Sequence, residues 1–250
     1  MALSLQSGLV PTEVAFLCEM EMITVVPRQR LESIPMLSGK TPALRPPRRA
    51  DLPLWLALLL KKQRRANILP PPWLLPASLQ EIVHAETNVN PEAFSPPPPA
   101  PMRSDGRGGA RRYGASDDGE GDLVLAPPFL PSCTQAAPSG YLPYHWLEIA
   151  ETLLAHAADD IPNAPEVRAL LRDLQEVRAA KMRASTRHLE GGGGVLNIRG
   201  VGAMELAESR GFVLGVVDGV RKLGASVEAG RREEELERGG ADESDDDMEL

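Results

Sequence analysis

Cysteine, aromatic residues and long apolar runs are scarce in this sequence. Two cysteines in 250 residues cannot form a disulfide framework, which indicates a reducing compartment. Aromatic residues make up 4% of the chain, too few for the core of a large β-sandwich. The longest apolar run, residues 52–60, is interrupted by Pro53 and is too short to cross a bilayer, and no cationic side chain precedes Arg28 as a secretory signal requires. We therefore expect a soluble, intracellular protein.

Positive charge is also scarce, which argues against a strongly basic DNA-binding domain. The chain holds 27 Lys and Arg against 35 Asp and Glu, a net charge of -8. Residues 231–250 contain 10 acidic and 3 basic side chains, a net charge of -7, so the other 230 residues are nearly neutral at -1. An acidic tail of this kind usually keeps a terminus solvated, although it could also bind a basic partner.

The sequence lacks the motifs of common enzymes. It contains no G-x-S-x-G elbow, no P-loop and no H-E-x-x-H pair, and its four histidines are scattered. The Gly-Val-Gly run at residues 200–202 has no third glycine at dinucleotide-binding spacing. His156 precedes Asp159 and Asp160 by one helical turn, but a histidine packed at a helix end is a better interpretation than a metal or acid–base site. We therefore predict no enzymatic activity, no cofactor and no metal.

The N-terminal part of the chain has the pattern of a small β-rich domain. Residues 22–26 (MITVV) form a largely β-branched run that ends at a proline, which is typical of a short strand. Residues 31–37 and 41–44 are candidates for further short strands, because recurring prolines prevent long strands or helices here. We expect a flexible N-terminus over residues 1–11 and a β-rich domain over residues 12–53, which is marginal alone.

Helical periodicity and helix-start signals dominate much of the remaining chain. Ser78 followed by Glu81 has the spacing of a capping box, and Asn163 followed by Glu166 predicts a second helix start. The predicted helices cover residues 54–65, 78–86, 144–158, 163–188, 202–209 and 212–223. The predicted fold class is therefore α+β and mainly α, with the small β-rich domain followed by a helical-bundle domain over residues 54–94 and 144–226.

Two segments are expected to be disordered. Residues 95–143 contain 10 Pro and 7 Gly without any periodicity, which is typical of a low-complexity insertion. An RGG-like element at residues 107–109 lies inside this insertion, but a solvated linker is the better interpretation of a single copy. Residues 227–250 form the acidic tail.

Two features indicate contacts with other proteins. Gly211, Gly215 and Gly219 share one helix face next to a valine stripe, and each glycine costs about 1 kcal/mol relative to Ala, which the close approach of another helix would justify. Between residues 45 and 65 the chain has seven basic residues and one acidic residue, a net charge of +6. This basic cluster favours a solvated helix end or a protein contact, and direct DNA contact is the alternative.

Short blocks along the chain resemble the Psf-two family of GINS complex subunits, which take part in eukaryotic DNA replication. The blocks are FLCE at residues 16–19, MITVVP at 22–27, PLWLA at 53–57, LPPPW at 69–73 and LLAHA at 153–157. The long helix adds side chains in the family's order and spacing: Arg168, Asp173, Arg178, Lys181 and Arg183. About 40 residues, 102–141, depart from the family's pattern, and we favour a translated intron over a lineage-specific loop by a narrow margin.

The resemblance implies a non-catalytic structural subunit of the GINS heterotetramer, located in the nucleus and needed for initiation and elongation of chromosomal DNA replication. The implied partners are the other three GINS subunits, the MCM ring and Cdc forty-five within the active replicative helicase, and DNA polymerase epsilon through the complex. Direct DNA contact would be weak or absent, and no membrane is involved. The alternative is a nucleic-acid-binding protein that uses the basic cluster at residues 45–65.

Thirteen side chains are candidates for the core or for partner contacts. The apolar candidates are Leu54, Trp55, Leu56, Trp73, Trp146, Ile149, Leu153, Leu170, Leu174 and Val177. We expect the first three of these to join the two domains. The basic candidates, expected to face a partner, are Lys61, Arg64 and Arg65.

Overall fold

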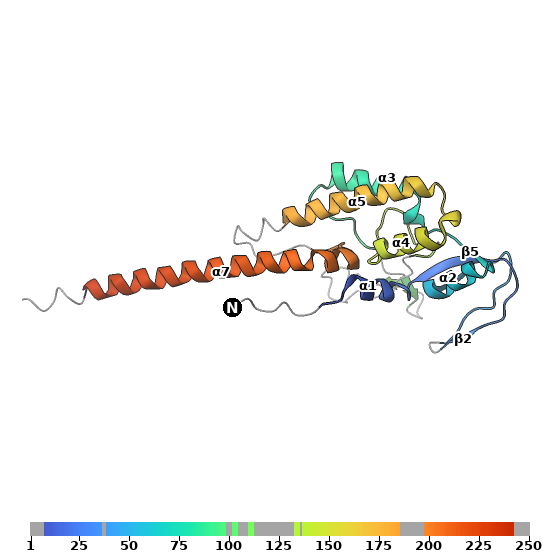
Figure 1. Cartoon of the computed structure of the whole chain (residues 1–250), viewed down its shortest axis with the longest axis horizontal. Helices are drawn as coiled ribbons and strands as arrows, with labels where there is room; N and C mark the ends of the chain where they lie inside the picture. Colours follow the sequence, from blue (N-terminus) through green and yellow to red (C-terminus); the bar gives the residue numbers. More distant parts are fainter. Residues whose placement is uncertain are drawn as a thin grey trace, which may run out of the picture.

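A small sheet, a helical body and one long projecting helix make up the described structure. The computed structural model describes residues 8–36, 39–98, 102–104, 110–112, 133–135, 137–185 and 198–242. The sheet lies at one end of the body, and the C-terminal helix α7 (Ala203–Asp242) projects from the other end (Figure 1). The predicted fold class, α+β and mainly α, is confirmed.

The N-terminal sheet contains three antiparallel strands in the order β4-β1-β5. They are β1 (Met22–Pro27), β4 (Ala50–Pro53) and β5 (Ala66–Ile68). Ile23 pairs with Leu52 and Val25 with Ile68, and all four side chains are buried. The predicted first strand is confirmed, whereas β5 was predicted as part of no strand.

The helix α2 (Leu54–Lys62) follows β4 directly and packs against this sheet. Its first amides, which have no partner inside the helix, donate to carbonyl oxygens that precede β1. The Leu54 amide lies 2.8 Å from the Glu21 oxygen, and the Trp55 amide lies 3.2 Å from the Glu19 oxygen. The structure therefore groups α2 with the small N-terminal domain, whereas the sequence analysis placed it at the start of the helical domain.

The connection between β1 and β4 is a narrow hairpin with shorter strands than expected. β2 (Pro35–Met36) pairs with β3 (Gly39–Lys40), and an isolated bridge joins Leu31 to Leu44. Prolines within this segment have no amide hydrogen to donate, which limits each run of pairing.

The helix α1 (Pro11–Cys18) corrects the prediction of a flexible terminus followed directly by the β-rich domain. Pro11 occupies the first helical position, where its missing N–H is not needed, and the Glu13 carboxylate accepts a hydrogen bond from the Val10 amide at 2.8 Å. α1 packs against α7 and α4 (Trp146–His156), and Val14 and Cys18 are buried.

The helical domain forms two layers, with α3 and α5 above α4 in Figure 1. Its elements are η1 (Pro72–Leu74), α3 (Pro76–His84), η2 (Ala85–Val89), α4, η3 (Ala158–Asp160), α5 (Ala164–Ser185) and α7. The predicted cap at Ser78 is wrong, because α3 begins at Pro76 and Ser78 is buried inside the helix. One hydrophobic cluster runs from the sheet through both layers of helices.

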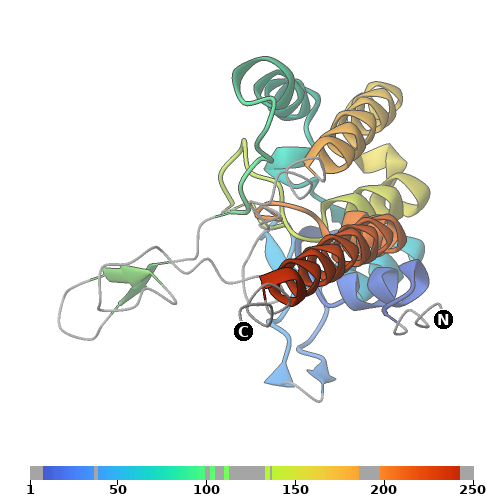
Figure 2. The same cartoon turned by 90° about the vertical axis from the view of Figure 1, so that its left-hand side faces the viewer.

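The ends of the segment predicted to be a disordered insertion are packed in the body. Ser95, Cys133 and Leu142 are buried, and Cys133 forms a parallel bridge with Ile23 of β1. Farther out, β6 (Met102–Ser104) and β7 (Ala110–Arg112) form a hairpin that stands apart from the body (Figure 2). The remaining insertion residues, including the RGG-like element at 107–109, lie outside the described residues.

The helix α7 corrects the prediction of two short helices followed by a disordered tail. It is continuous over 40 residues, so its helical backbone passes Gly224 and includes residues 227–242 of the predicted tail. Residues 243–250 lie outside the described part of the chain. None of the helices in the described ranges is both long enough and apolar enough to cross a membrane.

Candidate functional site

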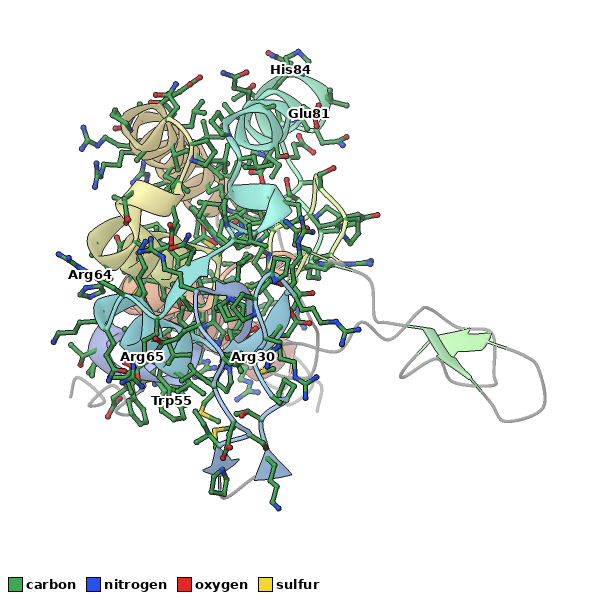
Figure 3. All side chains as sticks on the ribbon, turned by 90° about the vertical axis from the view of Figure 1, so that its right-hand side faces the viewer. Arg30, Trp55, Arg64, Arg65, Glu81 and His84 are labelled. Carbon is green, nitrogen blue, oxygen red and sulfur yellow. The ribbon has the colours of Figure 1, made fainter. Side chains whose placement is uncertain are left out.

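Most of the apolar candidates lie in the hydrophobic core of this chain. Buried members with at most 3% of their surface exposed are Leu54, Leu56, Trp73, Trp146, Ile149, Leu153 and Leu174. Leu170 and Val177 are half-buried, and Leu170 packs against the core. Trp55 is 38% exposed and lies on the outer side of α2 (Figure 3). Leu54 and Leu56 belong to the cluster that spans both domains, whereas Trp55 does not.

The most polar part of the interior is a group of ion pairs around Arg178 of α5, here called the Arg178 cluster. The Arg178 side chain is fully buried. Its Nη1 lies 2.5 Å from Glu86 Oε1, and its Nε lies 2.6 Å from Glu205 Oε1. Its Nη2 also donates to the Gly200 carbonyl oxygen at 2.6 Å. One guanidinium therefore ties α5 to η2 and to the first turn of α7.

Lys181 completes the cluster one turn farther along α5. Its Nζ lies 3.2 Å from Glu86 Oε2 and donates to the carbonyl oxygens of Asn90, at 3.2 Å, and Ala93, at 2.7 Å. Glu86 also accepts a hydrogen bond from the Ser95 amide at 2.9 Å. Two cations thus meet two carboxylates, and the start of the predicted insertion is fixed to α5.

Aromatic rings and glycines close the space around the cluster. Arg178 Cζ lies 4.9 Å from the Phe94 ring centroid and 5.6 Å from that of Trp146. A Cβ on Gly200, which has φ +85°, would lie 2.5 Å from the Ser95 carbonyl oxygen, and one on Gly202 would lie 2.8 Å from Trp146 Nε1. The Gly-Val-Gly run therefore has a packing reason.

Charge pairing keeps the cluster ionised in spite of its burial. Burial alone would raise the pKa of Glu86, but Arg178, the Ser95 amide and Lys181 hold it below its usual range. Burial likewise would lower the pKa of Arg178, which Glu205 and Glu86 instead raise. Removal of one partner from such a buried pair costs about 3–5 kcal/mol, because the other charge is left uncompensated. The Arg178 cluster is therefore a structural lock.

The sequence analysis noted Arg178 and Lys181 only as matches to a family pattern and missed their role. The available signal is spacing: Leu171, Leu174 and Arg178 follow at i, i+3 and i+7, so the arginine continues the buried face of α5. A cation on that face needs buried carboxylates opposite it. Glu86 and Glu205 carry no sequence signal that selects them, because their proximity arises from tertiary packing.

Lys61 connects the two domains and is not a free basic side chain. Its Nζ lies 2.7 Å from both Asp159 Oδ2 and Asp160 Oδ2, and only 10% of its side chain is exposed. Asp160 also accepts a hydrogen bond from the Ile68 amide of β5 at 2.7 Å. The hydrogen bond from Lys61 holds the pKa of Asp159 below its usual range. His156 is exposed, and the described ranges contain no cluster of three acidic, His or Cys side chains that could hold a metal.

Arg64 and Arg65 are exposed and follow the end of α2 (Figure 3). The Arg64 amide donates to the Lys61 oxygen and the Arg65 amide to the Leu60 oxygen, both at 2.9 Å, which is the Schellman pattern of a helix end. Arg64 has φ +58°, a left-handed conformation that favours glycine and costs roughly 1–2 kcal/mol for other residues. Helix termination here therefore does not require an arginine.

The outer part of α7 carries an apolar face without a partner among the described residues. No described atom lies within 4 Å of the position of a Cβ on Gly211, Gly215 or Gly219. Phe212 is 45% exposed and Leu223 is 68% exposed. This part of α7 extends beyond the other labelled helices in Figure 1. The predicted glycine face therefore exists, and no helix of the described chain covers it.

Comparison with known proteins gives two family matches that together span most of the chain. Residues 10–69 match the PSF2 N-terminal domain, which includes α2, and residues 73–224 match the GINS complex protein helical bundle domain. The second match ends at Gly224, before the end of α7.

Curated relatives cover nearly the whole chain. A DNA replication complex GINS protein PSF2 from Gibberella zeae is 69% identical over 229 residues, which cover 91% of this chain and 90% of the relative. Its counterpart from Neurospora crassa is 63% identical over 273 aligned positions that cover both chains completely. One from Debaryomyces hansenii is 31% identical over 245 residues, which cover 98% of this chain and 93% of the relative.

Proposed function

The chain belongs to the PSF2 family of GINS subunits in the DNA replication complex, and we propose that it acts there as a non-catalytic scaffold that binds the other three GINS subunits through the outer part of α7. Other GINS subunits are its partners, as membership of the complex implies. The proposal adds where they bind and what the subunit contributes.

The observation that carries the proposal is the contrast between cost and use on α7. Three glycines at i, i+4 spacing weaken a helix by about 1 kcal/mol each relative to Ala, and nothing in the described chain benefits from them. Next to them, Val216, Val217 and Val220 form a stripe together with the exposed Phe212 and Leu223. A helix from another subunit could approach closely over the glycines and bury the stripe.

The Arg178 cluster supports this use because it fixes the root of α7. Glu205 binds Arg178 and also accepts a hydrogen bond from the Gly202 amide at 2.7 Å, so the helix leaves the body in a defined direction. A fixed helix loses less conformational entropy when a partner binds than a mobile one does. We propose that assembly precedes the wider role: with the MCM ring and Cdc forty-five in the nuclear replicative helicase, and with DNA polymerase epsilon through the complex.

Co-expression with the other three subunits tests the proposal. We expect Val216→Asp combined with Val220→Asp to reduce recovery of the assembled complex by more than about tenfold, since two apolar side chains would lose burial worth about 1.5–3 kcal/mol each. Lys222→Asp is the matched control, because it creates the same i, i+4 acidic pair with Asp218 on the opposite side of α7. Equal recovery of the double variant and wild type would exclude the outer part of α7 as the assembly surface.

A further inference from the structure

A positively charged hollow lies where α2 ends, on the far side of the molecule from the outer part of α7 (Figure 1). Its volume is about 400 Å³. The side chains that line it are Arg28, Lys61, Lys62, Arg64, Ala66 and Asp159. Four cations thus face one carboxylate, although the protein as a whole carries a net charge of -8.

The cations of this hollow are only partly neutralised within the described chain. Lys61 is paired with Asp159 and with Asp160 behind it. Arg28 Nε donates to the neutral amide oxygen of Asn67 at 2.8 Å, which leaves its charge uncompensated. The described residues provide no ion pair to Lys62 or Arg64. The hollow is therefore positive overall, and an anionic group could enter it with Asp159 already occupied.

The helix dipole explains only part of this charge. Lys61 and Lys62 lie in the last turn of α2, where cations complement the partial negative charge of the helix end. Arg28 comes from the end of β1, and Arg64 occupies a left-handed position where glycine would be favourable. An arginine at a backbone position that disfavours it is consistent with a function for its side chain.

Exposed apolar side chains lie on the same face of α2 as Lys62. Trp55, Leu59 and Lys62 follow at i, i+4 and i+7, and Trp55 is 38% and Leu59 45% exposed. Large apolar groups beside cations are typical of protein interfaces, in which Trp and Arg contribute much of the binding energy. The α2 surface is defined here as Trp55, Leu59 and Lys62 together with Arg28 and Arg64.

We propose that the α2 surface binds an acidic protein segment that also carries bulky apolar side chains. Carboxylates of the segment would enter the hollow, and its apolar side chains would cover Trp55 and Leu59. Nucleic acid fits less well, because the hollow is compact, contains no aromatic side chain for base stacking, and offers no row of phosphate contacts. The inference rests on the proposed scaffold function, since the segment would belong to a further protein that binds the assembled complex.

The test uses a synthetic acidic peptide and the assembled complex. The probe is a fluorescein-labelled peptide of roughly 16 residues, made of Glu and Asp with Leu and Phe at i, i+3 and i+7 spacing. Fluorescence anisotropy at about 0.1 M salt measures its affinity for the full-length chain and for the complex with the other three subunits. We expect saturable binding to both.

Variants at two positions assign the binding to the α2 surface. Arg64→Gly removes one cation while it relieves the left-handed backbone, so the fold is retained, and Trp55→Ser removes the apolar part. Each is expected to weaken peptide binding by about fivefold or more. Arg172→Ala, which removes an exposed cation on α5, is the control and should leave the affinity unchanged.

Three results would overturn the inference: no saturable binding, equal binding by both variants and wild type, or tighter binding of a roughly 20-nucleotide single-stranded DNA that is weakened by Arg64→Gly. Size-exclusion chromatography of the same samples separates this inference from the proposed function. Normal assembly without peptide binding removes only the inference. Peptide binding to the full-length chain without assembly removes only the scaffold function.

Discussion

The two parts of α7 differ in how they use the same helical backbone. At its root, Glu205 is tied to the buried Arg178, and Gly202 lets the chain approach Trp146 so closely that a Cβ would lie 2.8 Å from the indole nitrogen. From Gly211 outward, a Cβ at each tested glycine would meet no described atom. Glycine is thus required for packing within this chain at the root, and is without any such use farther out.

This difference separates folding from assembly within one element. The root stabilises the monomer through charge pairing and close packing. The outer part contributes nothing to the monomer, and its glycines even weaken the helix. Changes at the root should therefore affect the free energy of unfolding, whereas changes farther out should affect binding to other subunits.

The largest effect on unfolding is expected at Arg178. Arg178→Met keeps much of the volume but leaves Glu86 and Glu205 with fewer charge partners, so we expect a loss of about 3–5 kcal/mol in the free energy of unfolding, measured by urea denaturation. Arg172→Met on the exposed side of the same helix should change it by less than about 0.5 kcal/mol. A loss below about 1 kcal/mol in Arg178→Met would show that the cluster is not a structural lock.

Acid should weaken the root as well, through Glu86. Its pKa is held below the usual range in the folded chain, so its contribution to stability is fully present above the unfolded pKa and is lost as the pH falls through the folded pKa. We expect the melting temperature to fall with decreasing pH in this acidic range. Glu86→Gln should have a lower melting temperature at pH 7 and a weaker dependence on acid. Identical pH profiles would contradict the assignment.

Two glycine substitutions sharpen the comparison within α7. Gly202→Ala should lower the free energy of unfolding by about 1–3 kcal/mol, because the added methyl group overlaps Trp146. Gly215→Ala should leave it unchanged or raise it by up to about 1 kcal/mol, because the methyl group meets nothing and Ala favours the helix. Denaturation of both full-length variants checks this, and equal losses would show that the two parts of α7 do not differ.

The sequence predicted most elements whose signal is local and missed those set by tertiary contacts. The β-branched run of β1 and the apolar stripes of α4 and α5 were recognised because each repeats along its own segment. The short strand β5 and the partners of Arg178 were missed, since both depend on residues far apart in the chain. The two ends of α7 show the same limit: spacing identified the glycine face, but only the structure shows that no described helix covers it.

Hydrogen–deuterium exchange on α7 tests the central claim most directly. In the free chain, amides of residues 203–210 should be protected, and those of residues 211–224 should exchange much faster because only the lone helix protects them. In the assembled complex we predict that residues 211–224 slow by at least about 100-fold, while residues 203–210 change little. Unchanged exchange of residues 211–224 on assembly would contradict the account.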